Sequence, residues 1–186
     1  MSKDANGQTT SYGYVDQNGN ADPLWRQRSV TDPLNNTTWT TYSPGGTLPA
    51  TVETAMVFNN GLSTADVLTT FDGLGRPYLK QRREQPAPYA NFDTVVTTYD
   101  VLGRVSSVGL PCVSTPSQPC SSPITTTTYD ASNRPLLVTD GGGGTTQYTY
   151  TNNDILTAVG PPPANENYKQ VQNQYDDLAG CGKIDS

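Results

Sequence analysis

Histidine is absent from the 186-residue sequence, and glutamate occurs only three times, at Glu53, Glu84 and Glu166. Without histidine the chain cannot assemble a Ser-His-Asp or Cys-His arrangement for nucleophilic catalysis. The aspartates are more numerous, but they stand at turn-like positions rather than in pairs typical of glycoside hydrolysis. The glycine run at 141–144 lacks the Lys-Ser/Thr pair of a phosphate loop. We therefore expect no enzyme activity, no catalytic residue and no cofactor.

Positive charge is also scarce, because 11 lysines and arginines face 17 acidic residues and leave a net charge of −6. The one basic cluster, Lys80, Arg82 and Arg83, stands beside Glu84. A duplex-binding protein needs a basic face that displaces phosphate counterions, so we expect no nucleic-acid partner. No apolar run approaches the ~18 residues of a membrane-spanning helix, which predicts no membrane insertion. The segment Met1 to Thr10 is polar and has no signal-peptide core.

Apolar residues are few as well, at 33% of the chain against roughly 45–50% in ordinary globular domains. Charged residues make up only 15%, whereas disordered chains usually carry a high net charge. The surplus lies in Thr and Tyr, which favour strands, and in Gly, Pro, Asn and Ser, which favour turns. This mixture predicts an all-β chain of many short strands joined by many turns.

A six-residue motif occurs three times, and its copies begin at positions 71, 99 and 129, which are 28 and 30 residues apart. Each copy follows a threonine run, starts with an aromatic residue and Asp, and ends with Gly or Asn and then Arg. The motif residues are Phe71, Asp72, Gly75, Arg76, Tyr99, Asp100, Gly103, Arg104, Tyr129, Asp130, Asn133 and Arg134.

The chemistry of the motif predicts a β-hairpin. Thr-Thr-Tyr is a favourable strand ending, and the Asp side chain accepts hydrogen bonds from the backbone amides that follow it. Gly at the fourth turn position suits a type I turn, and Asn133 is the next-best residue for a left-handed backbone. A second family of turns, at Asp32 and Asp140, alternates with the first. We expect turns at these and at Asp16, Asp72, Asp100 and Asp130, and hence an antiparallel up-and-down meander.

Weaker copies define the extent of the array. One begins at Tyr14 and keeps the Asp16-to-Gly19 spacing, and another begins at Tyr175 but has Ala179 where Gly is expected. The sequence therefore predicts a polar N-terminal extension over 1–13, a hairpin array over 14–178, and an interrupted repeat or C-terminal tail over 179–186. The last hairpin is expected to lack its return strand, and the spacing of apolar residues over 167–178 is also compatible with a helix.

The motifs resemble the YD repeats of RHS (rearrangement hotspot) proteins, which also occur in teneurins and insecticidal toxin-complex proteins. The resemblance runs from about Tyr14 to Leu178 and is strongest from Thr69 to Tyr150. It implies an open curved segment of a β-shell, taken from a larger secreted or cell-surface protein. In bacterial members such a shell encloses a C-terminal toxin, so the implied partners are flanking repeats of the parent chain or a toxin cargo. The family's self-cleaving core motif and a toxin domain have no counterpart here.

The aromatic and arginine side chains leave two interpretations of binding. Arg76, Arg104 and Arg134 either line a groove or, as we expect, pair with the turn aspartates and cover aromatic rings. The 11 tyrosines either form the core or, as the alternative function, belong to a carbohydrate-binding surface with Trp25 and Trp39 as glycan contacts. The acidic and amide residues between Asp16 and Asp22 lack the Gly and Glu positions of an EF-hand, so we expect no metal site.

Cys112 and Cys120 bracket a seven-residue segment of loop composition between two hairpins. In an oxidising compartment we expect a small loop disulfide, because two thiols without histidine make a poor zinc site. Cys181 would then be free or would pair with residues outside this chain.

Six hairpins are too few to close a shell of the implied kind, and a repeat relies on stacked neighbours to bury its apolar face. Both ends would also leave unpaired strand edges that attract other chains. We expect the isolated chain to be marginally stable and to associate edge to edge.

Overall fold

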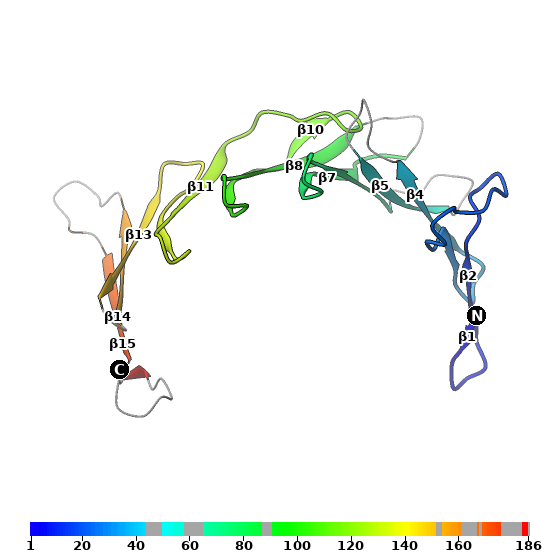
Figure 1. Ribbon diagram of the computed structural model, residues 1–186, viewed down its shortest axis with the longest axis horizontal. Coiled ribbons are helices and arrows are strands. Elements are labelled where there is room, and N and C mark those ends of the chain that lie inside the picture. Colours follow the sequence, from blue (N-terminus) through cyan, green and yellow to red (C-terminus); the bar gives the residue numbers. More distant parts are fainter. Residues whose placement is uncertain are drawn as a thin grey trace. The chain divides into compact units, whose positions relative to one another are not determined.

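The computed structural model describes residues 1–43, 50–57, 65–86, 91–151, 154–160, 167, 169–175 and 184–185. These ranges contain β-strands and turns and no helix, and every strand pair is antiparallel (Figure 1). The all-β antiparallel meander predicted from composition and repeats is therefore confirmed. Within the described ranges no helix is long and apolar enough to cross a membrane.

The described residues form sixteen strands. Their bounds are β1 Ser2–Lys3, β2 Thr9–Gly13, β3 Ser29–Thr31, β4 Thr37–Ser43, β5 Thr51–Val57, β6 Asp66–Phe71, β7 Pro77–Arg83, β8 Phe92–Tyr99, β9 Val105–Gly109, β10 Cys112–Ser114, β11 Ile124–Tyr129, β12 Pro135–Thr139, β13 Thr145–Thr151, β14 Asp154–Gly160, β15 Lys169–Tyr175 and β16 Ile184–Asp185.

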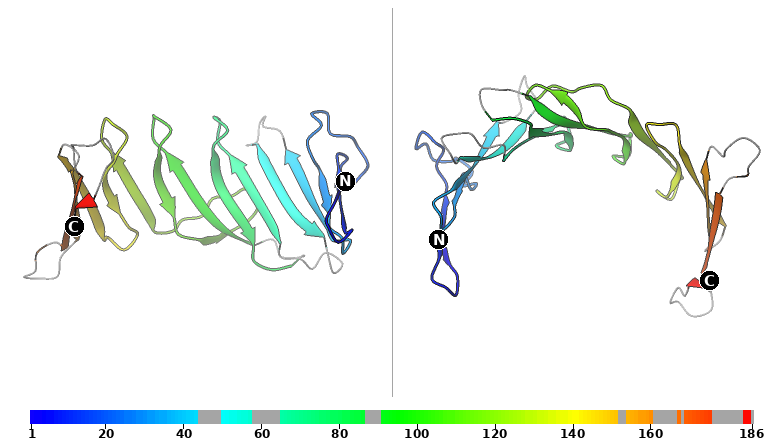
Figure 2. Two further views of the ribbon diagram at one scale, coloured as in Figure 1. Left: turned by 90° about the horizontal axis from the view of Figure 1, so that it is seen from below. Right: turned by 180° about the vertical axis from the view of Figure 1, so that it is seen from behind.

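The chain divides into two units. The first comprises Met1–Val96 and Pro111–Ser121, and the second comprises Thr97–Leu110 and Ser122–Ser186. In the first unit, β1 to β8 pair in chain order, and β10 pairs with β8. In the second unit, the end of β8 pairs with β9, β9 with β11, and β11 to β16 follow in chain order. Figure 2 shows successive strands of each unit alternating in direction.

Short turns with one shared geometry join most of the strands. At Asp72, for example, the amide of the fourth residue, Gly75, donates to the Asp carbonyl, and Gly75 has a φ of 76°. Just before this turn, the pairing of β6 with β7 shifts by one residue between Thr70 and Phe71, as in a type I turn closed by a G1 bulge. The turns predicted at Asp16, Asp32, Asp72, Asp100, Asp130 and Asp140 all have this hydrogen bond between the fourth and first residues.

Two further turns of this type escaped the sequence analysis, at Asp4 and Asp22. The first joins β1 and β2, so the predicted N-terminal extension over 1–13 is corrected to a paired hairpin. At the other end, Ile184 pairs with Tyr175, so the last hairpin has a short return strand, contrary to expectation. Within the helix-compatible segment, Lys169–Tyr175 forms β15 and pairs with β14.

A small core lies in the first unit, on one face of β6, β7 and β8. Leu79 and Phe92 are fully buried and Leu68 is nearly so. Their neighbours in this core are polar: Gln81 is paired in register with both Leu68 and Thr94, and all of its surface is buried. The segment Pro111–Ser121, which carries β10, contacts this face through Ser114 and Ser117.

The tyrosines do not form this core, contrary to one expectation from the sequence. The described tyrosines are half-buried or exposed, and Phe92 is the fully buried aromatic residue of the first unit. A tyrosine at or near the end of a strand keeps its hydroxyl in contact with hydrogen-bond partners while the ring covers neighbouring side chains. The tyrosines act in this way in the turn units described below.

Candidate functional site

The Asp side chain of each predicted motif organises its own turn. At Asp72, Oδ1 accepts hydrogen bonds from the amides of Leu74 and Arg76, both at 2.9 Å, while Oδ2 accepts from Arg76 Nε at 2.8 Å. Asp100 and Asp130 repeat these bonds with the residues two and four positions ahead. The hydrogen bond from the Arg76 side chain, followed by that from its amide, lowers the pKa of Asp72 below its ordinary value.

Arg104 and Arg134 each also reach a tyrosine on a neighbouring strand. The Arg104 guanidinium lies 4.5 Å from the Tyr129 ring centroid, and that of Arg134 lies 4.1 Å from Tyr150. The tyrosine hydroxyl in turn donates to the carbonyl of the residue after the arginine: Tyr129 to Val105 at 2.8 Å and Tyr150 to Pro135 at 2.7 Å. We call this arrangement the Asp–Arg–Tyr unit.

The Asp–Arg–Tyr unit also connects one turn to the next. Arg104 Nη1 donates to the Asp130 carbonyl at 3.2 Å and to Asn133 Oδ1 at 2.9 Å. Asn133 occupies the fourth turn position with a φ of 64°. One arginine therefore joins the Asp100 turn, the Asp130 turn and the Tyr129 ring within the second unit. Such connections hold successive hairpins in register and leave the arginines little freedom to bind another molecule.

A further Asp–Arg–Tyr unit, hidden in the sequence, is formed by Asp22, Arg26 and Tyr42. Arg26 pairs with Asp22 at 3.0 Å and lies 4.1 Å from the Tyr42 ring centroid, and the Tyr42 hydroxyl donates to Gln27. Trp25 occupies the position of the motif glycine, with a φ of 54°. This copy is not evident in the sequence, because Trp replaces Gly and no aromatic residue precedes Asp22. The four-residue Asp-to-Arg spacing is the signal that identifies it.

The two tryptophans named as glycan contacts lie in different settings. Trp25 is 78% exposed at the tip of its turn. Trp39 is half-buried on β4 and lines a hollow of about 440 Å³. The other residues around this hollow are Asp16, Gln17, Asn18, Arg28, Thr40, Thr41, Tyr42 and Glu53. The structure does not bring Trp25 into this hollow, so the pair does not form a common aromatic stripe.

A buried ion pair lies beside the small core. Asp66 on β6 is nearly inaccessible and accepts a hydrogen bond from Arg83 Nε at 2.7 Å. The Arg83 guanidinium lies 4.8 Å from the centroid of the Phe92 ring. Glu53 on β5 adds a second carboxyl group, and its burial, followed by the negative charge of Asp66, raises the pKa of Glu53 above its ordinary value. Arg83 is therefore part of the core and not of a basic surface.

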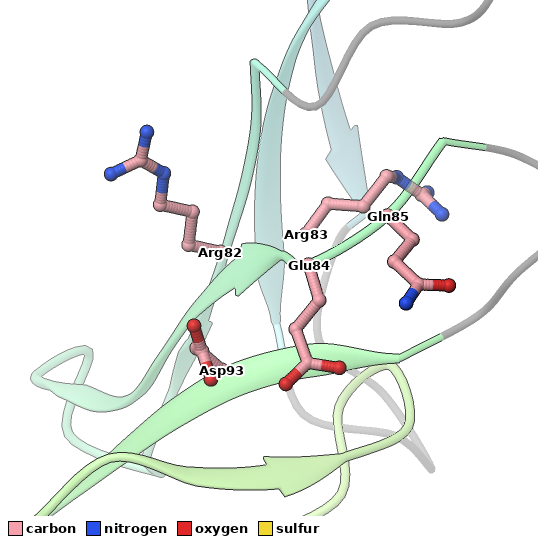
Figure 3. Close-up of a pocket in the computed structure, with 5 residues that line it drawn as sticks. All are labelled: Arg82, Arg83, Glu84, Gln85 and Asp93. Carbon is pink, nitrogen blue, oxygen red and sulfur yellow. The ribbon is translucent and has the colours of Figure 1, made fainter.

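A second hollow, of about 470 Å³, is lined by Arg82 and Arg83 of the basic cluster and by Glu84, Gln85 and Asp93. Figure 3 shows Arg82 and Arg83 pointing to opposite sides of β7, with Glu84 and Asp93 near each other below them. Burial and then the Asp93 carboxylate raise the pKa of Glu84. With both charge signs present and the two arginines directed apart, the cluster has no continuous basic face.

Cys112 and Cys120 are joined by a disulfide in the structure, with their Cα atoms 6.0 Å apart. Cys181 lies outside the described residues. Asp16 serves its own turn, because its carboxylate accepts from the amides of Asn18 and Asn20 and from the Asn20 side chain. Among the described residues, no group of three or more acidic, cysteine or histidine side chains is arranged to hold a metal ion.

Among the comparisons with known proteins, only those with solved structures find proteins similar to this chain. No family model matches the chain, and no curated protein matches it. One similar structure is a Tc holotoxin pore of Photorhabdus luminescens carrying a mutation in TccC3, with 12% identity, a TM-score of 0.42, and coverage of 89% of this chain and 9% of the other. Another is a TcdB2–TccC3 crystal structure, with 13% identity, a TM-score of 0.44, and coverage of 94% and 10%.

The present chain spans about a tenth of the length of these solved chains. The resemblance of this chain to RHS proteins rests on its own repeats.

Proposed function

We propose that this chain is a non-catalytic structural segment of an RHS/YD-repeat shell that belongs to a larger secreted or cell-surface protein and encloses a toxin cargo. The observation that supports this proposal is the connection of successive turns by Arg104, which ties two hairpins and a tyrosine together. An array stabilised from turn to turn is suited to extension by further repeats, since each unit depends chiefly on its neighbours.

The polar groups of the chain support a structural role. The motif aspartates and arginines form hydrogen bonds within their own turns. The buried Asp66 carboxylate is paired with Arg83, and its charge contributes to the raised pKa of Glu53 on the neighbouring strand.

The test uses the parent reading frame that contains this segment. We expect repeats on both sides of it, and we expect the cargo to resist limited proteolysis. The double variant Arg104→Ala/Arg134→Ala should increase cleavage of the cargo, whereas Arg82→Ala, on an exposed side chain of β7, should not. A parent without flanking repeats, or equal cleavage in both variants, would refute the shell proposal.

We further propose that the isolated chain associates through its outermost strands. In the described part of the chain, β1 pairs with β2 alone and β16 with β15 alone. Such edges present unpaired amides and carbonyls to other chains. Size-exclusion chromatography with light scattering should show a mass that increases with concentration. A monomer at all concentrations, with one sharp melting transition, would indicate a self-sufficient domain instead.

A further inference from the structure

The segment Pro111–Ser121 crosses the buried face of β7 and β8, and we call it the strap. Its base is fixed by the sheet, because the Leu110 amide donates to the Pro123 carbonyl at 2.9 Å. Within the strap, the disulfide between Cys112 and Cys120 closes the loop a second time. Reduction would remove the second closure and leave the first, so the strap would stay attached to the chain at its base.

The strap contacts the sheet chiefly through one buried glutamine. Gln81 Nε2 donates to Ser114 Oγ at 2.9 Å and to the Thr115 carbonyl at 3.0 Å, and the Ser117 amide donates to Gln81 Oε1 at 2.7 Å. A fourth bond, from Gln81 Nε2 to Thr94 Oγ1 at 2.9 Å, lies within the sheet. The strap therefore supplies most of the hydrogen bonds that a buried amide needs.

The polarity of this contact determines what it costs to open. Gln81 and Thr94 are fully buried beneath the strap, and both carry groups that water can bind in place of the strap. An apolar contact would instead lose its burial and gain nothing from water. A strap seated on an amide and a hydroxyl can therefore separate from the sheet at a lower cost than one seated on leucines.

The backbone of the strap also favours its release. Ser117, whose amide binds Gln81, has a φ of 59°. This left-handed conformation is unfavourable for a residue with a Cβ atom, and such a residue keeps it only while the surrounding contacts enforce it. Release of the strap would let Ser117 relax. The closed strap thus depends on the disulfide that holds its two ends together.

The disulfide itself is accessible to reagents. Cys112 and Cys120 are both half-buried rather than enclosed, and exposed disulfides are the ones that thiols reduce most readily. A thiolate of a dithiol attacks one sulfur and forms a mixed disulfide, while the other cysteine leaves as a thiolate. The second thiol of the reagent then attacks the mixed disulfide. The dithiol is oxidised to a disulfide by two electrons, and both cysteines become thiols.

We propose that the strap is a redox-controlled cover, which the disulfide keeps closed and which opens when a dithiol reduces Cys112 and Cys120. Opening exposes Gln81 and Thr94 on β7 and β8 and leaves the strands of the second unit paired. In the secreted parent of the proposed function, the strap would be closed outside the cell and would open in a reducing compartment. That consequence rests on the proposed function, whereas the opening itself does not.

Hydrogen exchange of the isolated chain, read by mass spectrometry, tests the opening. The variant Cys181→Ser leaves Cys112 and Cys120 as the only cysteines of the chain. We expect dithiothreitol to accelerate exchange at least ~10-fold in the strap and in β7, as in a local opening, and to leave β13 and β14 unchanged. Reoxidation should restore the slow exchange, and alkylation confirms the redox state of each sample.

A pair of neighbouring variants tests the contact beneath the strap. Ser114→Ala removes a partner of Gln81 and should accelerate exchange of the strap several-fold further in the reduced protein, with little change in the oxidised one. Val113→Ala is the matched control, because Val113 is 55% exposed on the same strand. It should behave as the parent variant does in both redox states.

Three outcomes would overturn the proposal. The first is unchanged exchange of the strap after complete reduction, and the second is equal acceleration in β7 and β13, which would mean that the whole chain unfolds. The third is an equal effect of Ser114→Ala and Val113→Ala in the reduced protein. These measurements use neither flanking repeats nor a cargo, so failure of the shell role would leave them unaffected.

Discussion

The two units of the chain share one turn chemistry but differ in what stabilises their strands. The first unit buries Leu68, Leu79 and Phe92 beneath a disulfide-bonded segment. In the second unit, the described residues that are buried are Gly109 and Gly160. The second unit therefore has no apolar core of its own among its described residues, and its Asp–Arg–Tyr units carry more of the stabilisation.

This difference shows that the repeat motif does not require a core. The turn aspartates, the arginines and the tyrosine hydroxyls form a chain of hydrogen bonds at the ends of strands, where alternation of polar and apolar residues is not needed. A core appears where a segment outside the repeat pattern, Pro111–Ser121, covers one face of the sheet.

Truncation of a buried leucine should have the largest effect. Leu79→Ala in the first unit removes a fully buried side chain and should lower the free energy of unfolding by about 3 kcal/mol, through lost burial and a residual cavity. Leu137→Ala, at a 36% exposed position of the second unit, should cost less than about 1 kcal/mol. Urea unfolding measures both, and equal losses would show that the second unit has a core as well.

Removal of the disulfide should also act on the first unit. The variant Cys112→Ser/Cys120→Ser should lose about 2–3 kcal/mol, the range for a short closed loop. Hydrogen exchange should accelerate in β7 and β8, which lie beneath the segment, and remain unchanged in β13 and β14. Alkylation of the unreduced wild-type protein provides the direct test of the pairing. Labelling of both Cys112 and Cys120 in protein from an oxidising compartment would contradict it.

Substitution of the connecting arginine should act on the second unit. Arg104→Ala removes the ion pair to Asp100, the contact with Tyr129 and two bonds to the next turn, and should cost about 1 kcal/mol at this partly exposed position. Arg104→Lys should recover only part of this loss, because lysine lacks the planar fork of donors. Arg82→Ala serves as the control in thermal melts. If Arg82→Ala lowered the melting temperature as much as Arg104→Ala does, the Asp–Arg–Tyr unit would have no special role in stability.

The smallest effects should appear in the pH dependence of stability, where the carboxyl groups of Glu53 and Asp130 act in opposite directions. Folding raises the pKa of Glu53 above its ordinary value of 4.5. Its contribution to the free energy of unfolding is therefore full in acid and is lost as the pH rises through the raised pKa. Folding lowers the pKa of Asp130 below its ordinary value of 3.8, chiefly through the Arg134 amide, so its contribution is full above that value and is lost as the pH falls.

Two neutral variants test this pair. Glu53→Gln should gain stability relative to the wild type as the pH rises towards neutrality, because it removes the cost of burying a charged carboxylate and, next, the repulsion by Asp66. Asp130→Asn should be less stable than the wild type at neutral pH, and the difference should shrink in acid. Melting temperatures across this pH range measure both, and parallel curves for the two variants would contradict the assignment.

Part of the candidate sites could be predicted from sequence. The pairing of Asp72 with Arg76 follows from a four-residue spacing within one turn, and the positive φ of Gly75 follows from residue type. Trp39 was named as a glycan contact from residue type alone, and the hollow around it depends on the Asp16 turn, more than 20 residues earlier in the chain. Trp25 stands at a glycine position with a φ of 54°, opposite to its conformational preference, so residue type could not predict the turn that it closes.

The sequence by itself determined the turns and the antiparallel order, because an Asp side chain bonds amides two and four residues ahead and a two-stranded hairpin closes locally. The tertiary structure decided which turns are connected and where a core forms. Arg104 reaches Tyr129 across 25 positions, and Gln81 reaches Ser114 across 33. Such contacts depend on strand register and on the path of a long connecting segment, which place distant side chains on the same face of a sheet.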